Sequence, residues 1–203
     1  MRYQSHLPPD RMPDISLIIQ HLTTGSEKLA EESVRQLVAL KEKAVPFLLD
    51  LRDSPDPDAR WWAYCALGQM HDVDTEWFFQ GLHDTAPEVR ESAVMALSSH
   101  PDPTAITELI KALDDNDRMV TALAGCALTR IGSEAVPSLL ETLESGKAES
   151  KIQAARSLAE IRDAHAIPAF MAALENGTEL VKFWAEQGLQ NLGSEMIYFN
   201  TNK

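Results

Sequence analysis

The chain has 203 residues, of which 31 are acidic and 18 are basic, so its formal net charge is −13 at pH 7. An acidic surface repels a polyanion, and this composition therefore disfavours a nucleic-acid partner. No stretch reaches the roughly 18 consecutive apolar residues of a membrane span, and residues 1–13 contain no apolar signal-peptide core. We therefore expect a cytoplasmic protein with no membrane span.

One helical pattern recurs along the chain every 30 or 31 residues. A marker leucine identifies each copy, with a small residue four positions before it, and the markers are Leu37, Leu67, Leu97, Leu128, Leu158 and Leu189. A shorter apolar segment precedes each copy, at residues 14–22, 44–52, 74–82, 105–113, 135–143 and 166–174. A fixed period of this kind predicts an all-α fold, an α-solenoid of six helix pairs.

In chain order, residues 1–13 contain three prolines and are predicted to form an N-terminal arm over the first unit. Residues 14–192 form the solenoid, and the second helix of its first unit is charged enough to cap the stack. Units two and three carry most of the aromatic residues, namely Trp61, Trp62, Tyr64, Trp77, Phe78 and Phe79. Residues 193–203 are too short for another unit and are predicted to fold back as a capping tail.

The two cysteines, Cys65 and Cys126, occupy the same position in units two apart. Packed helices lie about 9 Å apart, which separates these residues by roughly 18 Å. A disulfide requires Cα atoms within about 7 Å, so the sequence predicts two free thiols in a reducing compartment.

A candidate partner-binding stripe runs along the second helices, opposite the face that the marker leucines define as core. Water alone would favour a polar stripe, yet apolar residues interrupt it and carboxylates edge it. The candidate residues are Trp61, Cys65, Glu88, Glu91, Met95, Met119, Leu180 and Phe183. A stripe of this composition suits a protein or peptide partner that is apolar and basic. The alternative is that superhelical twist buries some of these side chains between units.

A basic residue recurs seven positions before the marker leucine in four units, at Arg60, Arg90, Lys151 and Lys182. This series resembles an anion site, but a structural role is favoured, because half-buried basic groups are normally paired. Each is expected to bind turn carbonyls or the turn aspartate and so to link units, with Asp84 and Arg90 as the predicted pair.

The pattern VPxLLxxL, a turn with Asp, then VRxxAxxAL resembles HEAT-like repeats over residues 14–192. The period is shorter than the roughly 40 to 47 residues of ordinary HEAT repeats and is similar to the compact type of the phycobilisome lyases. The resemblance implies an α-solenoid, and it implies an alternative function as a phycobilin lyase-like protein or pigment-protein chaperone. In that case Trp61, Tyr64 and Cys65 would lie near a bilin, although no sequence motif supports one.

No known catalytic motif is present. The six histidines form neither HxxxH nor HExxH, and no Gly-rich phosphate loop or GxSxG occurs. Deoxyhypusine hydroxylase, a HEAT-repeat enzyme, binds iron through His-Glu steps, and this chain contains none. We therefore expect no catalytic residue, metal or cofactor, and we interpret the chain as a non-catalytic protein–protein interaction scaffold or adaptor.

Overall fold

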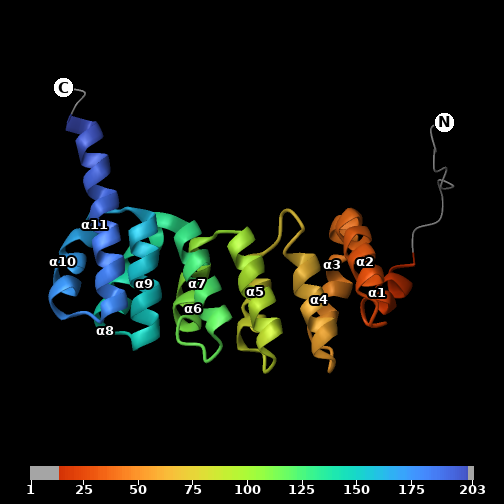
Figure 1. Ribbon diagram of the computed structural model, residues 1–203. Coiled ribbons are helices and arrows are strands. Elements are labelled where there is room, and N and C mark those ends of the chain that lie inside the picture. Colours follow the sequence, from red (N-terminus) through yellow and green to blue (C-terminus); the bar gives the residue numbers. More distant parts are fainter. Residues whose placement is uncertain (1–13, 201–203) are drawn as a thin grey trace.

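The computed structural model describes residues 14–200, with side chains up to residue 193, and every element in that range is helical. The helices stand side by side in one row (Figure 1). Their pairs are α1 (Ile15–Leu22) with α2 (Glu27–Leu40), α3 (Val45–Leu51) with α4 (Pro57–Leu67), α6 (Ile106–Ala112) with α7 (Arg118–Ile131), α8 (Val136–Ser145) with α9 (Ala148–Ile161), and α10 (Ile167–Asn176) with α11 (Glu179–Asn200). The predicted α-solenoid is confirmed, and the predicted arm at residues 1–13 lies outside the described residues.

The third unit departs from the predicted helix pair. Its second helix is α5 (Pro87–Ser99), but its first is replaced by two 3₁₀ segments, η2 (Thr75–Phe78) and η3 (Gln80–His83). Gly81 is a poor helix former, and the aromatic residues before it lose side-chain freedom in an α-helix. A Cβ at Gly81 would lie 2.6 Å from the Tyr64 ring, so this segment packs closely against α4.

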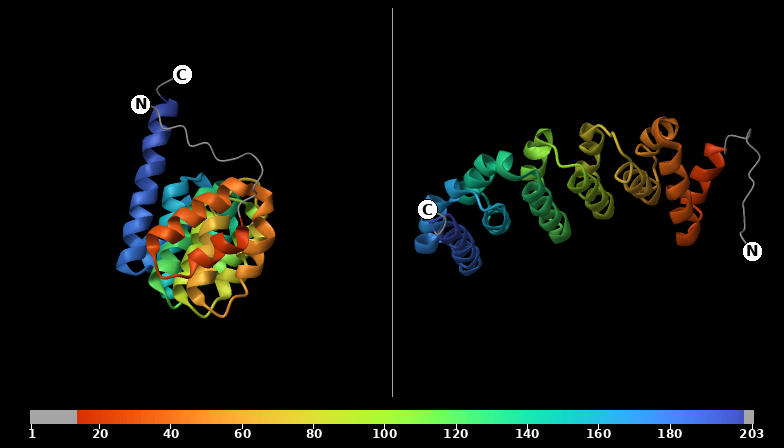
Figure 2. Two further views of the ribbon diagram at one scale, coloured as in Figure 1. Left: turned by 90° about the vertical axis from the view of Figure 1, so that its right-hand side faces the viewer. Right: turned by 90° about the horizontal axis from the view of Figure 1, so that it is seen from above.

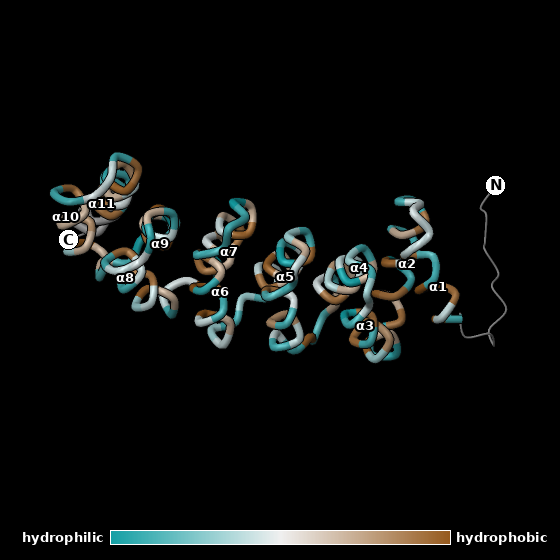
Figure 3. Tube along the Cα trace, turned by 90° about the horizontal axis from the view of Figure 1, so that it is seen from below, coloured by the Kyte–Doolittle hydropathy of each residue, from teal (hydrophilic) through white to brown (hydrophobic). Residues whose placement is uncertain are grey.

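The row of helix pairs is gently curved. Views from above and from below agree that α4, α5, α7, α9 and α11 line its inner side, while α3, α6, α8 and α10 lie outside (Figures 2 and 3). The second helix of each of these units therefore lies on the concave side, as the stripe prediction assumed. We call this surface the concave face.

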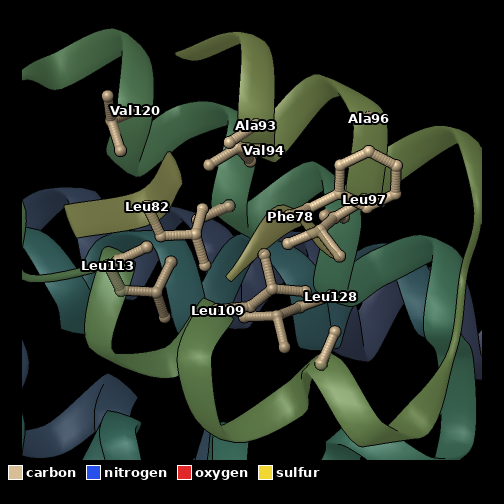
Figure 4. Packing of buried hydrophobic residues seen from close by; sticks show 14 of the residues in the cluster. Phe78, Leu82, Ala93, Val94, Ala96, Leu97, Leu109, Leu113, Val120 and Leu128 are labelled. Atoms are coloured by element: carbon tan, nitrogen blue, oxygen red, sulfur yellow. The ribbon is translucent and has the colours of Figure 1, made fainter. Parts of the chain in front are cut away.

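The core is continuous from unit to unit and is built from small and branched residues. In each of the first five units the marker leucine and the small residue four positions earlier are buried. Figure 4 shows the layer between units three and four, where Phe78 and Leu97 lie near Leu109 and Leu128. Small residues let neighbouring helices approach, and leucines fill the space between them.

Both ends of the stack present polar residues where inner units are apolar. The position three before the marker is buried in the first five units but is the exposed Glu186 in the sixth. At the other end, Glu32 and Gln36 are exposed at positions where units two to five have buried or half-buried residues. The two side chains bond to each other at 3.2 Å. Within the described side chains both ends therefore present polar groups, although the apolar Leu29 of the first unit is also 44% exposed.

Residues 193–203 were predicted to fold back as a capping tail, but the described part of this segment, up to residue 200, continues a helix instead. Helix α11 continues to Asn200 without a break, and Figure 1 shows it extending beyond the row. A single glycine, Gly193, does not end the helix, because nothing crowds it and a helix tolerates one glycine at a cost of about 1 kcal/mol. The chain therefore does not turn back over the end of the stack at residue 193.

Candidate partner-binding face

Two arginines of the second helices join consecutive units through bidentate ion pairs. Arg60 on α4 donates from Nε and Nη2 to the carboxylate of Asp84 at 2.6 and 2.7 Å. Arg90 on α5 donates in the same way to Asp115, with both distances 2.8 Å. Each carboxylate belongs to the turn of the following unit. Asp84 and Asp115 also accept from the backbone N–H two residues ahead, and so close their own turns.

The predicted pairing of the Asp84 and Arg90 side chains is wrong. The Asp84 carboxylate pairs with Arg60 of the preceding unit, and Arg90 pairs with Asp115 of the following unit. Arg90 reaches the Asp84 backbone carbonyl, at 2.9 Å, while its guanidinium pairs forward with Asp115. Arg60 likewise donates to the Ser54 carbonyl at 2.8 Å. An arginine therefore binds its own turn through a carbonyl and the next turn through a carboxylate, because the turns of adjacent units lie one above the other.

These ion pairs are largely withdrawn from solvent, since the side chains of Arg60 and Asp84 are 14% and 12% exposed. The hydrogen bond from Arg60 lowers the pKa of the Asp84 carboxyl below its ordinary value, although burial opposes this. Burial raises the pKa of Asp115, but the hydrogen bonds from Arg90 and the turn amides outweigh it and lower the pKa overall. Both carboxylates are therefore ionised near neutral pH.

The two lysines of the predicted structural ladder behave differently from the arginines. Lys151 donates from Nζ to the Glu144 carbonyl at 2.7 Å, which is the expected bond to the turn. Lys182 instead lies 3.8 Å from Glu179 within its own helix. The prediction that Lys182 links units is therefore not met, because no unit follows the sixth in the described chain.

A second series of links, which sequence reasoning missed, joins the other end of the second helices. In each link a side chain donates to a backbone carbonyl of the preceding unit. The links are His100 Nε2 to Gly68 at 3.0 Å, Arg130 Nη1 to Ser98 at 3.0 Å, Ser157 Oγ to Gly125 at 2.9 Å, and Asn191 Nδ2 to Ala159 at 3.1 Å. Most of these acceptors are the unpaired carbonyls near a helix C-terminus. The donors differ in type from unit to unit, so the sequence contains no repeated signal for them.

Four of the predicted partner-binding residues are large exposed apolar side chains. Met95 and Met119 are each 56% exposed, Leu180 is 57% exposed and Phe183 is 49% exposed. All four lie on second helices opposite the buried positions. Other large exposed apolar residues are Leu29 on α2 and, on first helices, Leu17, Phe47 and Met171.

Trp61 and Cys65 are half-buried rather than fully exposed. The ring of Trp61 packs edge-on against that of Trp62, with centroids 4.4 Å apart, and both rings contact the core. Cys65, Gly68 and Met95 line a shallow cavity of about 120 Å³ between α4 and α5. Burial raises the pKa of the Cys65 thiol to about 12, so the thiol is protonated and unreactive near neutral pH.

The expectation that Tyr64 would adjoin a bilin is not supported by its position. Tyr64 is 1% exposed and its ring lies near Phe78, with centroids 6.4 Å apart. Among the neighbouring aromatic residues, Phe78 is also buried, while Trp77 and Phe79 are half-buried. Tyr64 is therefore a core residue between units two and three.

The two predicted acidic residues lie on α5. Glu88 is exposed and Glu91 is half-buried. Burial raises the pKa of Glu91, and the nearby Asp117 and Glu88 carboxylates raise it further, while the charge of Arg90 lowers it only in part. The Glu91 carboxylate is therefore less well stabilised than one in a direct ion pair.

No group of three or more His, Cys, Asp or Glu side chains within the described residues is arranged to hold a metal ion. In the same range, no helix combines the length and apolar character needed to cross a bilayer. A larger cavity of about 380 Å³ lies among α6, α8 and the start of α9. Its Asp114 carboxylate is already bound by Lys147 at 3.0 Å and by Ser150. The concave face, which carries four large exposed apolar side chains, is the candidate site.

The arginine links, the small-residue core and the curved row define a HEAT-type helical repeat protein. Comparison with family models agrees: residues 75–150 match HEAT repeats, and residues 151–176 match the PBS lyase HEAT-like repeat. The chain is therefore a HEAT-like repeat solenoid of the short-repeat type.

Among curated proteins, the chain is similar to phycocyanobilin lyase subunit beta from Nostoc sp. strain PCC 7120. The two are 32% identical over 123 residues, which is 60% of this chain and 61% of that protein. The match therefore spans about three fifths of the relative's length.

Solved structures show the same fold at lower identity. The complex of CpcE and CpcF of phycocyanin lyase from Nostoc sp. PCC7120 matches with a TM-score of 0.54 at 20% identity, over 95% of this chain and 82% of that chain. Human deoxyhypusine hydroxylase matches with a TM-score of 0.53 at 18% identity, over 89% and 84% of the two chains. An engineered protein matches with a TM-score of 0.52 at 23% identity, over 90% and 98%. At these identities the likeness concerns the fold alone.

Proposed function

We propose that this chain is a non-catalytic scaffold that binds a partner protein or peptide on its concave face. The observation that carries the proposal is the row of exposed apolar side chains on the second helices, at Met95, Met119, Leu180 and Phe183. Exposed apolar residues in a series, with polar residues beside them, are typical of protein-interaction surfaces.

The polar ends of the stack support a lateral partner over an end-to-end one. Glu32 and Gln36 at one end and Glu186 at the other are exposed where inner units have residues that pack on a neighbour. Stacking a second copy on either end would desolvate these groups.

Site-specific photocrosslinking tests the proposal in the native host. A photoreactive phenylalanine analogue placed at Met95 or Met119 is expected to crosslink a defined partner, and the same analogue at the exposed Glu141 on α8 provides the control. Because α8 lies on the outer side, Glu141 should not crosslink that partner. Equal crosslinking from the two sides would exclude the concave face as the binding surface.

A second candidate function is a subunit of a bilin lyase-like or pigment-chaperone assembly. The 32% identity to phycocyanobilin lyase subunit beta favours it, although the match spans 61% of that protein. The test mixes the purified chain with phycocyanobilin and records the absorption spectrum. A red-shifted, intensified band that weakens in a Trp61→Ala variant would support this candidate, and an unchanged spectrum would remove direct pigment binding.

A further inference from the structure

Three neighbouring second helices, α4, α5 and α7, carry an uncharged band on the concave face. Its members lie two positions before and one position after the marker leucine, and they are Cys65, Met95, Cys126, Gly68, Ser98 and Thr129. In the other units the position two before the marker is charged or strongly polar, at Arg35, Arg156 and Gln187. We call the six residues of units two to four the uncharged band.

The uncharged band contains a cavity between α4 and α5. Its volume is about 120 Å³, and Cys65, Gly68, Met95 and Ala96 are among its lining residues. An apolar cavity of about 150 Å³ admits a benzene ring, so this one has room for one apolar side chain of a partner. Met95 is 56% exposed beside it and is able to contact the same partner.

The acidic residues of these three helices all lie on one side of the uncharged band, toward the helix N-termini. They are Asp58, Glu88 and Glu91. Glu91 precedes Met95 by one turn and Glu88 precedes it by two turns, which is about 6 and 10 Å along the helix axis. The apolar Trp61 and Met119 lie among them, so this side offers both carboxylates and apolar surface.

Little positive charge within the chain meets these carboxylates. The first turns of α4, α5 and α7 hold three arginines, and two of them, Arg60 and Arg90, are engaged in the links between units. The third, Arg118, is exposed. Burial and neighbouring carboxylates raise the pKa of Glu91, and the charge of Arg90 offsets this only in part. A cation supplied by a partner would therefore stabilise this side of the band.

The polar side chains along the band favour a helical partner over an extended one. Gln69, Ser99 and Thr129 each donate to the carbonyl four residues earlier in their own segment, at 3.1, 3.1 and 2.9 Å. An extended segment would bring its N–H and C=O groups against a surface with few free partners for them. An α-helix satisfies its backbone internally and needs only side-chain contacts.

The dimensions of the band fit a short helix. Packed helices lie about 8–10 Å apart, so the band extends about 16–20 Å from α4 to α7. A helix of about 11–13 residues has this length. Its diameter is about 10–12 Å, so one flank of a helix centred on the band lies over Glu91, one turn away.

Resting on the proposed function, we propose that the uncharged band binds an amphipathic α-helix of a partner protein, with an apolar stripe and a row of basic residues along one flank. One apolar side chain of the stripe fills the cavity between α4 and α5. The rest of the stripe packs on Met95 and Cys126, since sulfur-containing side chains adapt to apolar helices. The basic flank pairs with Asp58, Glu88 and Glu91.

Synthetic peptides test the proposal with the full chain. The probe is a labelled peptide of two heptads, with leucine at the first and fourth positions, lysine at the second and fifth, and glutamine or alanine elsewhere, and its binding is followed by fluorescence anisotropy. A peptide of the same composition with the leucines spread around the helix should bind about tenfold more weakly, because it cannot bury them together. Prolines at the two central solvent-facing positions prevent the helix, keep every contact residue, and should weaken binding similarly.

Two pairs of matched variants locate the bound peptide. Met95→Ser removes a side chain of the band, and Met171→Ser on the outer α10 removes one that is equally exposed, at 55% against 56%. Glu88→Lys/Glu91→Lys reverses the charge beside the band, and Glu141→Lys/Glu144→Lys on the outer α8 changes the net charge equally at two exposed residues. Each concave variant should weaken binding about tenfold, while the outer variants should bind like the unmodified chain at physiological ionic strength. Circular dichroism verifies that all four remain folded.

Three results would overturn the proposal. They are equal binding of the peptide with dispersed leucines, undiminished binding of the proline peptide, and equal effects of the concave variants and their outer controls. Crosslinking from Met95 or Met119 that persists in any of these cases would refute this inference alone. Loss of concave-face crosslinking would refute the proposed function as well.

Discussion

Replacing Asp84 by asparagine should uncouple units two and three. The substitution keeps the size of the side chain and its ability to close the turn, but it removes the charge that faces Arg60. The guanidinium, 14% exposed, would then keep the Ser54 carbonyl as a partner and lose both of its charged bonds. The effect measured is therefore mainly that of a buried cation without its anion.

The expected magnitude follows from this burial. Removing one partner of a buried ion pair costs about 3–5 kcal/mol, and the residual solvent access of this pair places the cost near the lower end, at about 3 kcal/mol. The exposed pair of Arg35 and Glu32, with side chains 60% and 52% exposed, provides the contrast. Glu32→Gln should cost much less, because an exposed ion pair contributes little to stability.

Urea denaturation followed by circular dichroism measures both variants. In a repeat array the stability is a sum of unit and interface terms, so a weakened interface should also broaden the transition and lower its slope. A Met substitution of Arg60 in the Asp84→Asn background should recover part of the loss, because it removes the unpaired cation. If Asp84→Asn and Glu32→Gln destabilise the chain equally, the ion pair does not couple the units.

Three further predictions concern packing, reactivity and pH. Gly81→Ala should destabilise the chain by about 1–3 kcal/mol, because the new Cβ meets the Tyr64 ring, whereas Gly193→Ala, with nothing within 4 Å, should not; thermal melts compare the two. Cys65, whose pKa burial raises to about 12, should be alkylated at least tenfold more slowly in the folded chain than in urea, as mass spectrometry can follow. The depressed pKa of Asp84 contributes stability above its unfolded value of about 3.9, and that contribution should disappear as acid titration proceeds below about pH 4. The Asp84→Asn variant should lack this part of the acid dependence.

The forward direction of the arginine links was present in the sequence, although the prediction assigned it wrongly. The position seven before the marker leucine lines up with the turn residue of the following unit, 24 or 25 residues later. Where that turn residue is Asp the earlier residue is Arg, and where it is Ser or Asn it is not. The aligned positions are Ala30 and Ser54, Arg60 and Asp84, Arg90 and Asp115, Thr121 and Ser145, and Lys151 and Asn176. Comparing the basic position of each unit with the turn residue of the next unit would have identified both ion pairs.

Other features depend on contacts that no single repeat encodes. His100 donates to the Gly68 carbonyl while its ring stacks on Phe78, with centroids 6.0 Å apart, and no other unit uses a histidine there. The 3₁₀ segments of the third unit arise where Gly81 meets the Tyr64 ring. Periodicity predicts the number and direction of helices well, but it cannot predict a contact made by a residue type that occurs in one unit.

The different roles of the positions within each second helix support the proposal that a specific partner binds the concave face. In α4 and α5, Arg60 and Arg90 hold the next turn, and the marker leucines fill the core. Changing such residues disturbs an interface between units. The concave positions vary more from unit to unit: six positions before the marker leucine, for example, Trp61, Glu91 and Phe183 occupy equivalent places. A surface that varies along a repeated frame can match a partner residue by residue.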